Sequence, residues 1–162
     1  INALGSSLLL LSREAGPALL EEIRLRAAVS AVWESLSHAS SKPVSLRLMV
    51  PEETIVSADP ALLDLVLRNV LDNALRHSGQ GEIVCALEGS RLIFSDCGPG
   101  FAEAELPRVF DRFFSGLQGR HGLGLALVRH LCRASGWQVG AGNAATGGGR
   151  VTIELGNSLR PT

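Results

Sequence analysis

The spacing of hydrophobic positions along the chain switches repeatedly between a helical period and a strand period, and these switches mark the expected elements. Spacings of three and four residues indicate helices, whereas alternation of apolar and polar residues indicates strands. Blocks of helix between hairpins that look antiparallel predict an α+β sandwich, with one layer of sheet and one of helices. The expected helices are 1–15, 18–38, 60–78, 103–114 and 122–133, and the expected strands are 44–50, 54–57, 82–87, 91–95, 137–142 and 150–155.

The stretch 60–78 is the helix around which the rest of the chain is expected to be organised. Asp59 precedes it at the N-cap position and Pro60 occupies the first helical position, and both residues favour a helix start. One face of this helix is apolar and is predicted to lie on the sheet. That face consists of Leu63, Leu67, Val70, Leu71 and Ala74.

Another face of the same helix collects polar side chains that need an explanation. Asn69 and Asn73 stand one turn apart, and Arg76 and His77 follow on the same face. Asparagine inside a helix costs about 0.6 kcal/mol relative to alanine, because its amide competes for backbone partners. Two asparagines in register, one turn after apolar residues, predict a partly buried polar site. The alternative is a pair of asparagines that face solvent.

Composition narrows the class of protein. The 162 residues are 46% hydrophobic and 19% charged, which suits one compact domain. A formal net charge of −1 argues against charge-driven binding of nucleic acid. No apolar run approaches the ~20 residues that a membrane-spanning helix needs. Cys85, Cys97 and Cys132 lack metal-ligand spacing and are expected to be reduced thiols that pack as small apolar groups.

A carboxylate turn carries the second candidate chemistry. Asp96 follows the expected strand 91–95 and precedes Gly98 and Gly100, so a ligand could approach the backbone closely here. A buried Asp96 could accept a hydrogen bond from an exocyclic amine. The alternative is an ordinary turn in which Asp96 bonds only its own loop.

The third candidate binding feature is a helix that begins with glycines. Residues 122–125 open an apolar helix, whose free amides and positive dipole end suit a phosphate group. Close packing of this helix on a neighbour is the alternative. Neither a Walker A loop nor a GxGxxG motif is present, and the glycines at 147–149 are interpreted as a turn between strands.

In this order, the three motifs resemble the catalytic ATP-binding domain of sensor histidine kinases, in the superfamily that includes gyrase and mismatch-repair ATPases. Residues 69–77 match the N box of that family, 96–100 its first glycine box, 109–114 its phenylalanine box and 122–125 its second glycine box. The resemblance implies the Bergerat fold, a mixed and mostly antiparallel sheet covered by about three helices, with ATP between the N-box helix and a lid. It also divides the chain into the end of a dimerisation helix at 1–16, a catalytic domain at 17–156 and a tail at 157–162. The sequence itself predicts disorder over 156–162.

The resemblance implies a role for each motif residue. Asn73, together with Asn69, would hold Mg²⁺ that bridges the phosphates of ATP. Arg76 would touch the phosphates, His77 would lie beside them, and Asp96 would bind the adenine amine. The other nucleotide contacts that it implies are Gly98, Gly100, Arg120, His121, Gly122, Leu123, Gly124 and Leu125.

Arg120 lies in the lid that the resemblance implies, residues 115–121, which is short for the family. It could contact the β- or γ-phosphate of ATP, or it could be a solvated charge. The sequence leaves both interpretations open.

Asn69 discriminates between reactions within the superfamily. Relatives that hydrolyse ATP generally have a glutamate at this position, one turn before the metal-binding asparagine, and it activates the attacking group. An asparagine cannot act as a base, so Asn69, Asn73 and Arg76 are expected to serve phosphoryl transfer to a histidine, which brings its own nucleophilic nitrogen. The rival functions are a degenerate nucleotide-sensing module without transfer activity and an ATP hydrolase.

The phosphoacceptor histidine is expected to lie outside this chain. None of His38, His77, His121 and His130 has the acidic, proline-followed context of such an acceptor. By the resemblance, the helix 1–15 would end the dimerising hairpin that carries it. The expected partners are that hairpin and a response regulator, and no binding of nucleic acid is expected. The chain is expected to lie in the cytoplasm, as part of a longer homodimeric kinase that is anchored in the inner membrane.

Overall fold

The structure is a computed structural model that describes residues 19–111 and 124–160. Its helices are α2 (Leu25–His38), α3 (Pro60–His77) and α4 (Gly124–Ala134), and its short 3-10 helices are η2 (Leu106–Arg108) and η4 (Gly156–Ser158). Its strands are β1 (Glu21–Arg24), β2 (Val44–Met49), β3 (Ile55–Ala58), β4 (Gly81–Glu88), β5 (Arg91–Ser95), β6 (Gln138–Asn143) and β7 (Gly149–Glu154).

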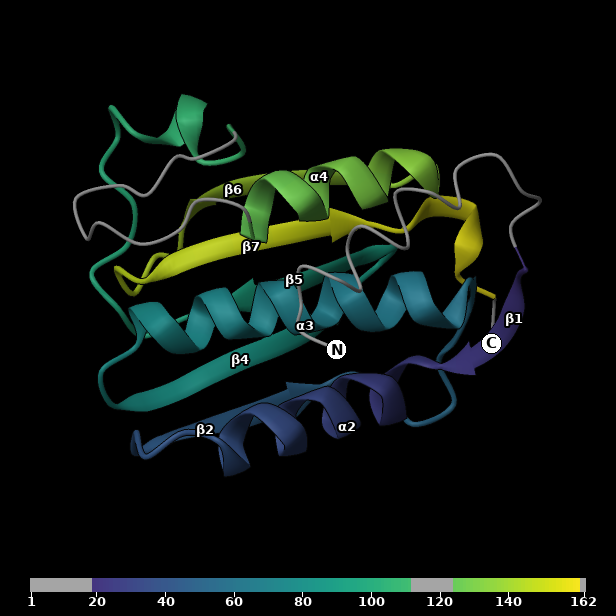
Figure 1. Ribbon diagram of the computed structural model, residues 1–162, viewed down its shortest axis with the longest axis horizontal. Helices are drawn as coiled ribbons and strands as arrows, with labels where there is room; N and C mark the ends of the chain where they lie inside the picture. Colours follow the sequence, from purple (N-terminus) through teal and green to yellow (C-terminus); the bar gives the residue numbers. More distant parts are fainter. Residues whose placement is uncertain (1–18, 112–123, 161–162) are drawn as a thin grey trace.

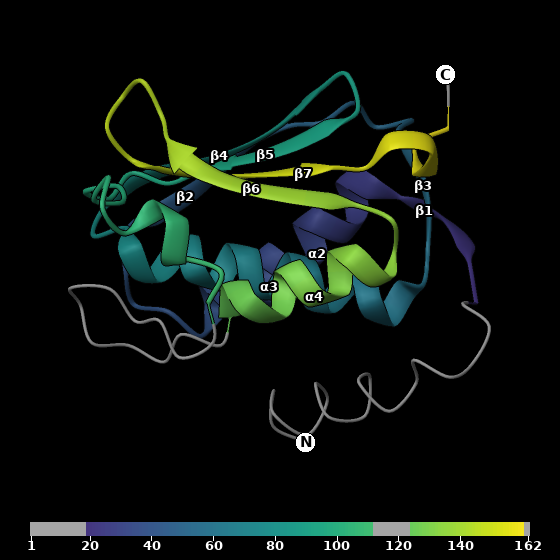
Figure 2. The same cartoon turned by 90° about the horizontal axis from the view of Figure 1, so that it is seen from above.

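Five strands form one mixed sheet in the order β2-β4-β5-β7-β6. β2 runs parallel to β4, whereas the other neighbouring strands of this sheet are antiparallel. The three helices lie together on one face of the sheet, as Figure 2 shows from above. The predicted α+β sandwich, with a mostly antiparallel sheet and three helices, is therefore confirmed. No helix in the described part of the chain is long and apolar enough to cross a membrane.

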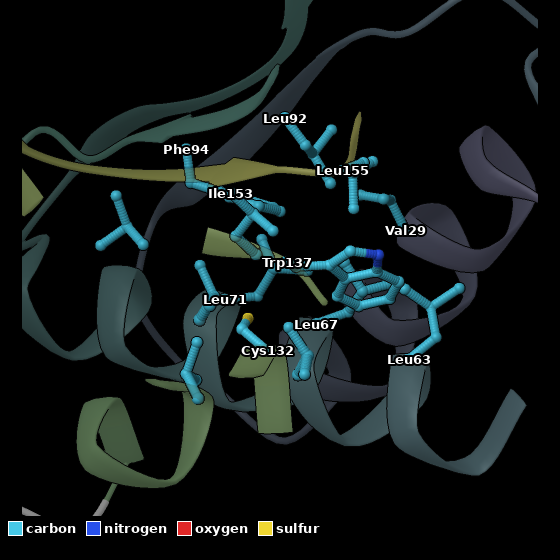
Figure 3. Packing of buried hydrophobic residues seen from close by; sticks show 14 of the residues in the cluster. Val29, Leu63, Leu67, Leu71, Leu92, Phe94, Cys132, Trp137, Ile153 and Leu155 are labelled. Carbon is cyan, nitrogen blue, oxygen red and sulfur yellow. The ribbon is translucent and has the colours of Figure 1, made fainter. Parts of the chain in front are cut away.

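The helix α3 is the middle one of the three helices (Figure 1). The main core lies between this helix and the sheet. The predicted apolar face of α3 is buried throughout, with no residue of it more than 4% exposed. Figure 3 shows Leu67 and Leu71 of this face near Trp137 and Ile153. Asp59 caps the helix as predicted, since its Oδ1 accepts hydrogen bonds from the amides of Ala61 and Leu62.

Three elements differ from the sequence prediction. The predicted helix 18–38 begins only at Leu25, because 21–24 instead forms β1 and pairs antiparallel with β3. The described part of the predicted helix 103–114 contains only η2, where Pro107 lacks the amide that a longer helix needs. The predicted disordered tail is wrong for 156–160, because Ser158 accepts a hydrogen bond from the Trp137 indole and Leu159 bridges to Val56.

Arg26, in the first turn of α2, joins this helix to β2. Its Nη1 donates hydrogen bonds to the carbonyl oxygens of Leu48 at 3.1 Å and of Val50 at 2.6 Å. β2 stands at one end of the strand order, so these bonds reach the outermost strand on that side of the sheet.

Candidate nucleotide-binding site

Four segments meet at one end of the sheet. They are the C-terminal half of α3, the loop after β5, the start of α4 and the turn between β6 and β7 (Figure 1). The predicted site residues in the described part of the chain come from the first three of these segments. The turn between β6 and β7 was predicted only as a connection.

Asp96 is the most buried of the polar site residues, with 8% of its surface exposed. Its Oδ1 accepts two hydrogen bonds of 2.9 Å, from the amides of Gly98 and Gly149. These bonds occupy one carboxylate oxygen and fix the plane of the group. No hydrogen bond joins Oδ2 to any other residue that the structure describes. Asp96 therefore does bond its own loop, as the alternative interpretation held, but with one oxygen only.

The glycines around Asp96 make room for this arrangement. A Cβ on Gly98 would lie 2.1 Å from the carbonyl oxygen of His77, so the end of α3 and the loop after β5 can meet only because residue 98 has no side chain. A Cβ on Gly149 would lie 2.7 Å from Oδ2 of Asp96. A side chain at 149 would therefore occupy the space next to the carboxylate oxygen that no described residue bonds.

Two further contacts fix the end of α3 at the site. Ser78, which is 1% exposed, accepts a hydrogen bond of 3.2 Å from the amide of Cys97 through its Oγ. Lys42 donates from Nζ to the carbonyl oxygens of Leu75 and Arg76, at 2.9 and 3.0 Å. A cation at this position also complements the negative end of the helix dipole.

Asn69 faces the start of α4. Its Nδ2 donates a hydrogen bond of 2.7 Å to the carbonyl oxygen of Leu65, within α3. The amide oxygen then points away from its own helix, and a Cβ on Gly124 would lie 3.8 Å from it. Gly124, the first residue of α4, therefore lies next to Asn69, and the sequence predicts both as site residues. An amide oxygen beside a helix N-terminus suits both a hard cation and the anion that the cation would accompany.

The other polar residues of this face differ in their surroundings. Asn73 is half-buried, and its side chain forms no hydrogen bond with the described residues, so its oxygen is also available. Arg76 is exposed and pairs with Asp72 at 2.9 Å. Because an exposed ion pair contributes only about 0.2–1 kcal/mol, Arg76 could exchange Asp72 for a phosphate at small cost. The ring of His77 lies 6.4 Å from that of Phe101, on the carboxylate side of the site.

The lid and most of the second glycine box lie outside the described residues. This holds for the predicted contacts Arg120, His121, Gly122 and Leu123. Leu125 is 7% exposed and belongs to the main core, so only its backbone can contribute to a ligand site.

The contribution of the β6–β7 turn to the candidate site was not predicted from the sequence. Gly149 supplies a donor to Asp96, and Asn143 bonds the backbone of Phe101. Three consecutive glycines at 147–149 are more than a turn requires, and this excess was the available signal. Asn143 offered none, because a single asparagine at the end of a strand is common in turns.

The cysteine prediction is correct for two of the three thiols. Cys85 and Cys132 are buried and free, and burial raises the pKa of each to about 12. Cys97 is exposed instead, because it lies in the loop beside Asp96, where its Sγ donates to the carbonyl oxygen of Gln80 at 3.0 Å.

Comparison with known proteins gives consistent matches. The family model described as histidine kinase-, DNA gyrase B- and HSP90-like ATPase matches residues 58–158. Sensor protein QseC of Salmonella typhi is 36% identical over 130 residues, which cover 76% of this chain and 29% of QseC. The chain thus spans less than a third of the length of that relative.

Two other matches cover most of their counterparts. Sensor histidine kinase component HK1 of Mycobacterium tuberculosis strain H37Rv is 37% identical over 130 residues, which cover 75% of this chain and 77% of HK1. The solved structure of the mycobacterial sensor histidine kinase MprB superposes with a TM-score of 0.76 at 26% identity. That superposition covers 88% of this chain and all of the MprB chain.

Proposed function

The chain belongs to the family of histidine kinase-, DNA gyrase B- and HSP90-like ATPases, and on that premise we propose that it is the ATP-binding catalytic module of a two-component sensor histidine kinase. The reaction is transfer of the γ-phosphoryl group of ATP to a histidine on a dimerisation helix outside this chain. The observation that carries this proposal is the buried Asp96. One of its oxygens accepts hydrogen bonds from two backbone amides, and no residue that the structure describes bonds the other.

The base and the phosphates of ATP have separate supports in this proposal. Oδ2 of Asp96 accepts a hydrogen bond from the exocyclic amine of adenine. The oxygens of Asn69 and Asn73 fit Mg²⁺, which prefers oxygen ligands and, when bound, neutralises charge on the phosphates. The N-terminus of α4 at Gly124 and the guanidinium of Arg76 supply the positive charge on the protein side.

The proposed phosphoryl transfer requires no general base from this chain. The bond between the γ-phosphorus and its bridging oxygen breaks, ADP leaves, and a P–N bond forms with a neutral imidazole nitrogen that brings its own electron pair. Asn69 would hold Mg²⁺ and cannot deprotonate water, so hydrolysis of ATP is slow. The helical hairpin that carries the histidine and a response regulator are the partners. The chain works on the cytoplasmic side, in a homodimeric parent anchored in the inner membrane.

Binding of ATP is the first test. Isothermal titration calorimetry with ATP and ADP, each with and without Mg²⁺, compares the wild type with Asn73→Ala. We expect binding that strengthens with Mg²⁺ and that loses this dependence in Asn73→Ala. Asn157→Ala, which changes an exposed asparagine in η4 at the opposite end of β7, is the matched control. Binding that is independent of Mg²⁺ and unaffected by Asn73→Ala would contradict the assignment.

Transfer is the second test. The chain is mixed with the separately expressed helical hairpin of its parent and ATP labelled on the γ-phosphate. We expect label on a histidine of the hairpin, none on this chain and little free phosphate. Binding of ATP without any label on the hairpin would leave a nucleotide-sensing module, and steady release of phosphate by the chain alone would indicate a hydrolase.

A further inference from the structure

The side chain of Asn143, the last residue of β6, is hydrogen-bonded to the loop that follows Asp96. The amide of Phe101 donates a hydrogen bond of 2.7 Å to Asn143 Oδ1, and Asn143 Nδ2 donates one of 2.9 Å to the carbonyl oxygen of Phe101. A backbone amide can only donate and a backbone carbonyl can only accept, so the orientation of the asparagine side chain is fixed. One side chain therefore satisfies both backbone groups of a residue that lies 42 positions away.

The loop and the β6–β7 turn are in direct contact at this point. Gly100 has a φ of +79°, which favours glycine, and a Cβ there would lie 2.6 Å from the carbonyl oxygen of Gly147 and 2.7 Å from Asn143 Oδ1. The loop can therefore reach Asn143 only through a glycine in a left-handed conformation. Glycine adopts this conformation without strain, and the two bonds from Asn143 to Phe101 hold the neighbouring residue of the loop in place.

The bonds of Asn143 act on the carboxylate through the loop. Gly98, three residues before Phe101, donates to Oδ1 of Asp96, and the ring of Phe101 packs near that of His77. Without the asparagine amide, Phe101 would lose both backbone bonds, and the loop would hold Gly98 and Phe101 in place for less of the time. Asn69, Asn73 and Gly124 lie on α3 and α4, so the same change leaves the phosphate side in place.

We propose that Asn143 is a positioning residue for the base half of the nucleotide site, which keeps the 98–101 loop and the Asp96 carboxylate in the arrangement that binds adenine. This inference rests on the proposed function, because it assumes that the site binds ATP. Apparent affinity falls in proportion to the fraction of molecules in the competent arrangement. Loss of two backbone hydrogen bonds reduces that fraction to roughly a tenth, which raises the Kd for Mg·ATP about tenfold.

The test compares a ligand that has a base with one that does not. Calorimetry measures the Kd of the wild type, Asn143→Ala and the control Asn157→Ala for Mg·ATP, and competition against Mg·ATP gives the Kd for magnesium tripolyphosphate. We expect Asn143→Ala to weaken Mg·ATP about tenfold and to leave tripolyphosphate within about twofold. Asn73→Ala should weaken both ligands. In nucleotide-free protein, the amide of Phe101 should exchange hydrogen faster in Asn143→Ala than in the wild type.

The outcomes separate this inference from the proposed function. If the wild type does not bind Mg·ATP, the proposed function fails and the inference fails with it. If the wild type binds but Asn143→Ala keeps its affinity, or loses affinity for both ligands equally, the positioning role is wrong while the proposed function stands. Should Asn143→Ala not fold, the isosteric Asn143→Asp replaces it. This variant keeps the acceptor for the Phe101 amide and loses the donor, so the same selective loss for Mg·ATP is expected, and its absence would overturn the inference.

Discussion

The amide of Gly149 donates a 2.9 Å hydrogen bond to Oδ1 of Asp96, which joins the start of β7 to the end of β5 across 53 residues. The amide of Asp96 returns a bond of the same length to the carbonyl oxygen of Gly149. The two residues thus continue the pairing of β5 with β7 by one step beyond the end of β5. In this step a side chain replaces one of the backbone acceptors, and that replacement orients the carboxylate.

Asp96→Asn should weaken ATP binding without unfolding the protein. Asparagine keeps an oxygen for the amides of Gly98 and Gly149, but its NH2 group replaces Oδ2 and cannot accept a bond from the adenine amine. A lost bond to a charged group corresponds to roughly 10- to 100-fold in Kd, measured by calorimetry with Mg·ATP. Asp59→Asn is the control, because asparagine caps a helix as well as aspartate does. Unchanged affinity in Asp96→Asn would rule out a direct contact with the base.

Gly149→Ala should be destabilising and should reduce ATP binding, whereas Gly140→Ala should do neither. A Cβ at 149 would lie 2.7 Å from Asp96 Oδ2 and 3.1 Å from Cε2 of Phe101, but at 140 it would meet nothing within 4 Å. Overpacking of this kind costs about 1–3 kcal/mol in the free energy of unfolding, measured by urea denaturation. Both glycines lie in neighbouring strands, so equal effects of the two substitutions would show that steric conflict at Asp96 is not the cause.

Thiol labelling should distinguish Cys97 from the two buried cysteines. Burial raises the pKa of Cys85 and Cys132 to about 12, so neither forms the reactive thiolate in the folded protein near neutral pH. Treatment with iodoacetamide followed by mass spectrometry should find one adduct, on exposed Cys97, and three after unfolding in urea. Because Cys97 adjoins Asp96, saturating Mg·ATP should slow its labelling. A second adduct in the folded protein would contradict the packing described for the buried thiols.

Stability should fall at acidic pH partly through Glu154. Hydrogen bonds from the Ser90 hydroxyl, the Gly156 amide and Arg91 lower the pKa of this carboxyl. A lowered pKa in the folded state means that the stabilisation is complete above the ordinary value and is lost as the pH falls through the folded value. Melting curves from about pH 6 to pH 3 should therefore show a smaller loss of stability in Glu154→Gln than in the wild type, with exposed Glu88→Gln as control. The difference should be small, because Glu154 is solvent-accessible.

The parts of the fold that the sequence predicts are those with local causes. The helix α3 has its cap, its proline and its apolar face within twenty neighbouring positions, and the β4–β5 hairpin has a glycine turn at Gly89 with φ +61°. β1 was missed because its four residues also fit the helical period of α2. Only the partner strand β3, more than thirty positions away, decides between helix and strand for them.

The residues of the candidate site likewise fall into those with a local signal in the sequence and those without one. Asn69 and Asn73 could be predicted as site residues because asparagine is unusual inside a helix, and Asp96 and Gly98 because a carboxylate followed by glycines stands at the end of a strand. Asn143 is an ordinary residue for a turn, and the glycine run at 147–149 does not reveal which residue Gly149 contacts. The importance of both residues arises from bonds that cross 42 and 53 positions. Contacts over such distances along the chain are set by the topology of the sheet, which no local pattern contains.

The two bonds from Arg26 to β2 have a consequence for how this protein behaves in a crowded solution. An outermost strand presents unpaired carbonyl groups that can recruit a strand from another molecule and so begin aggregation. At the end of β2, the carbonyl oxygens of Leu48 and Val50 already accept from an internal arginine. A strand from another molecule would have to displace that guanidinium to extend the sheet here. Arg26 therefore protects this end of β2 against intermolecular strand pairing, in addition to linking α2 to β2.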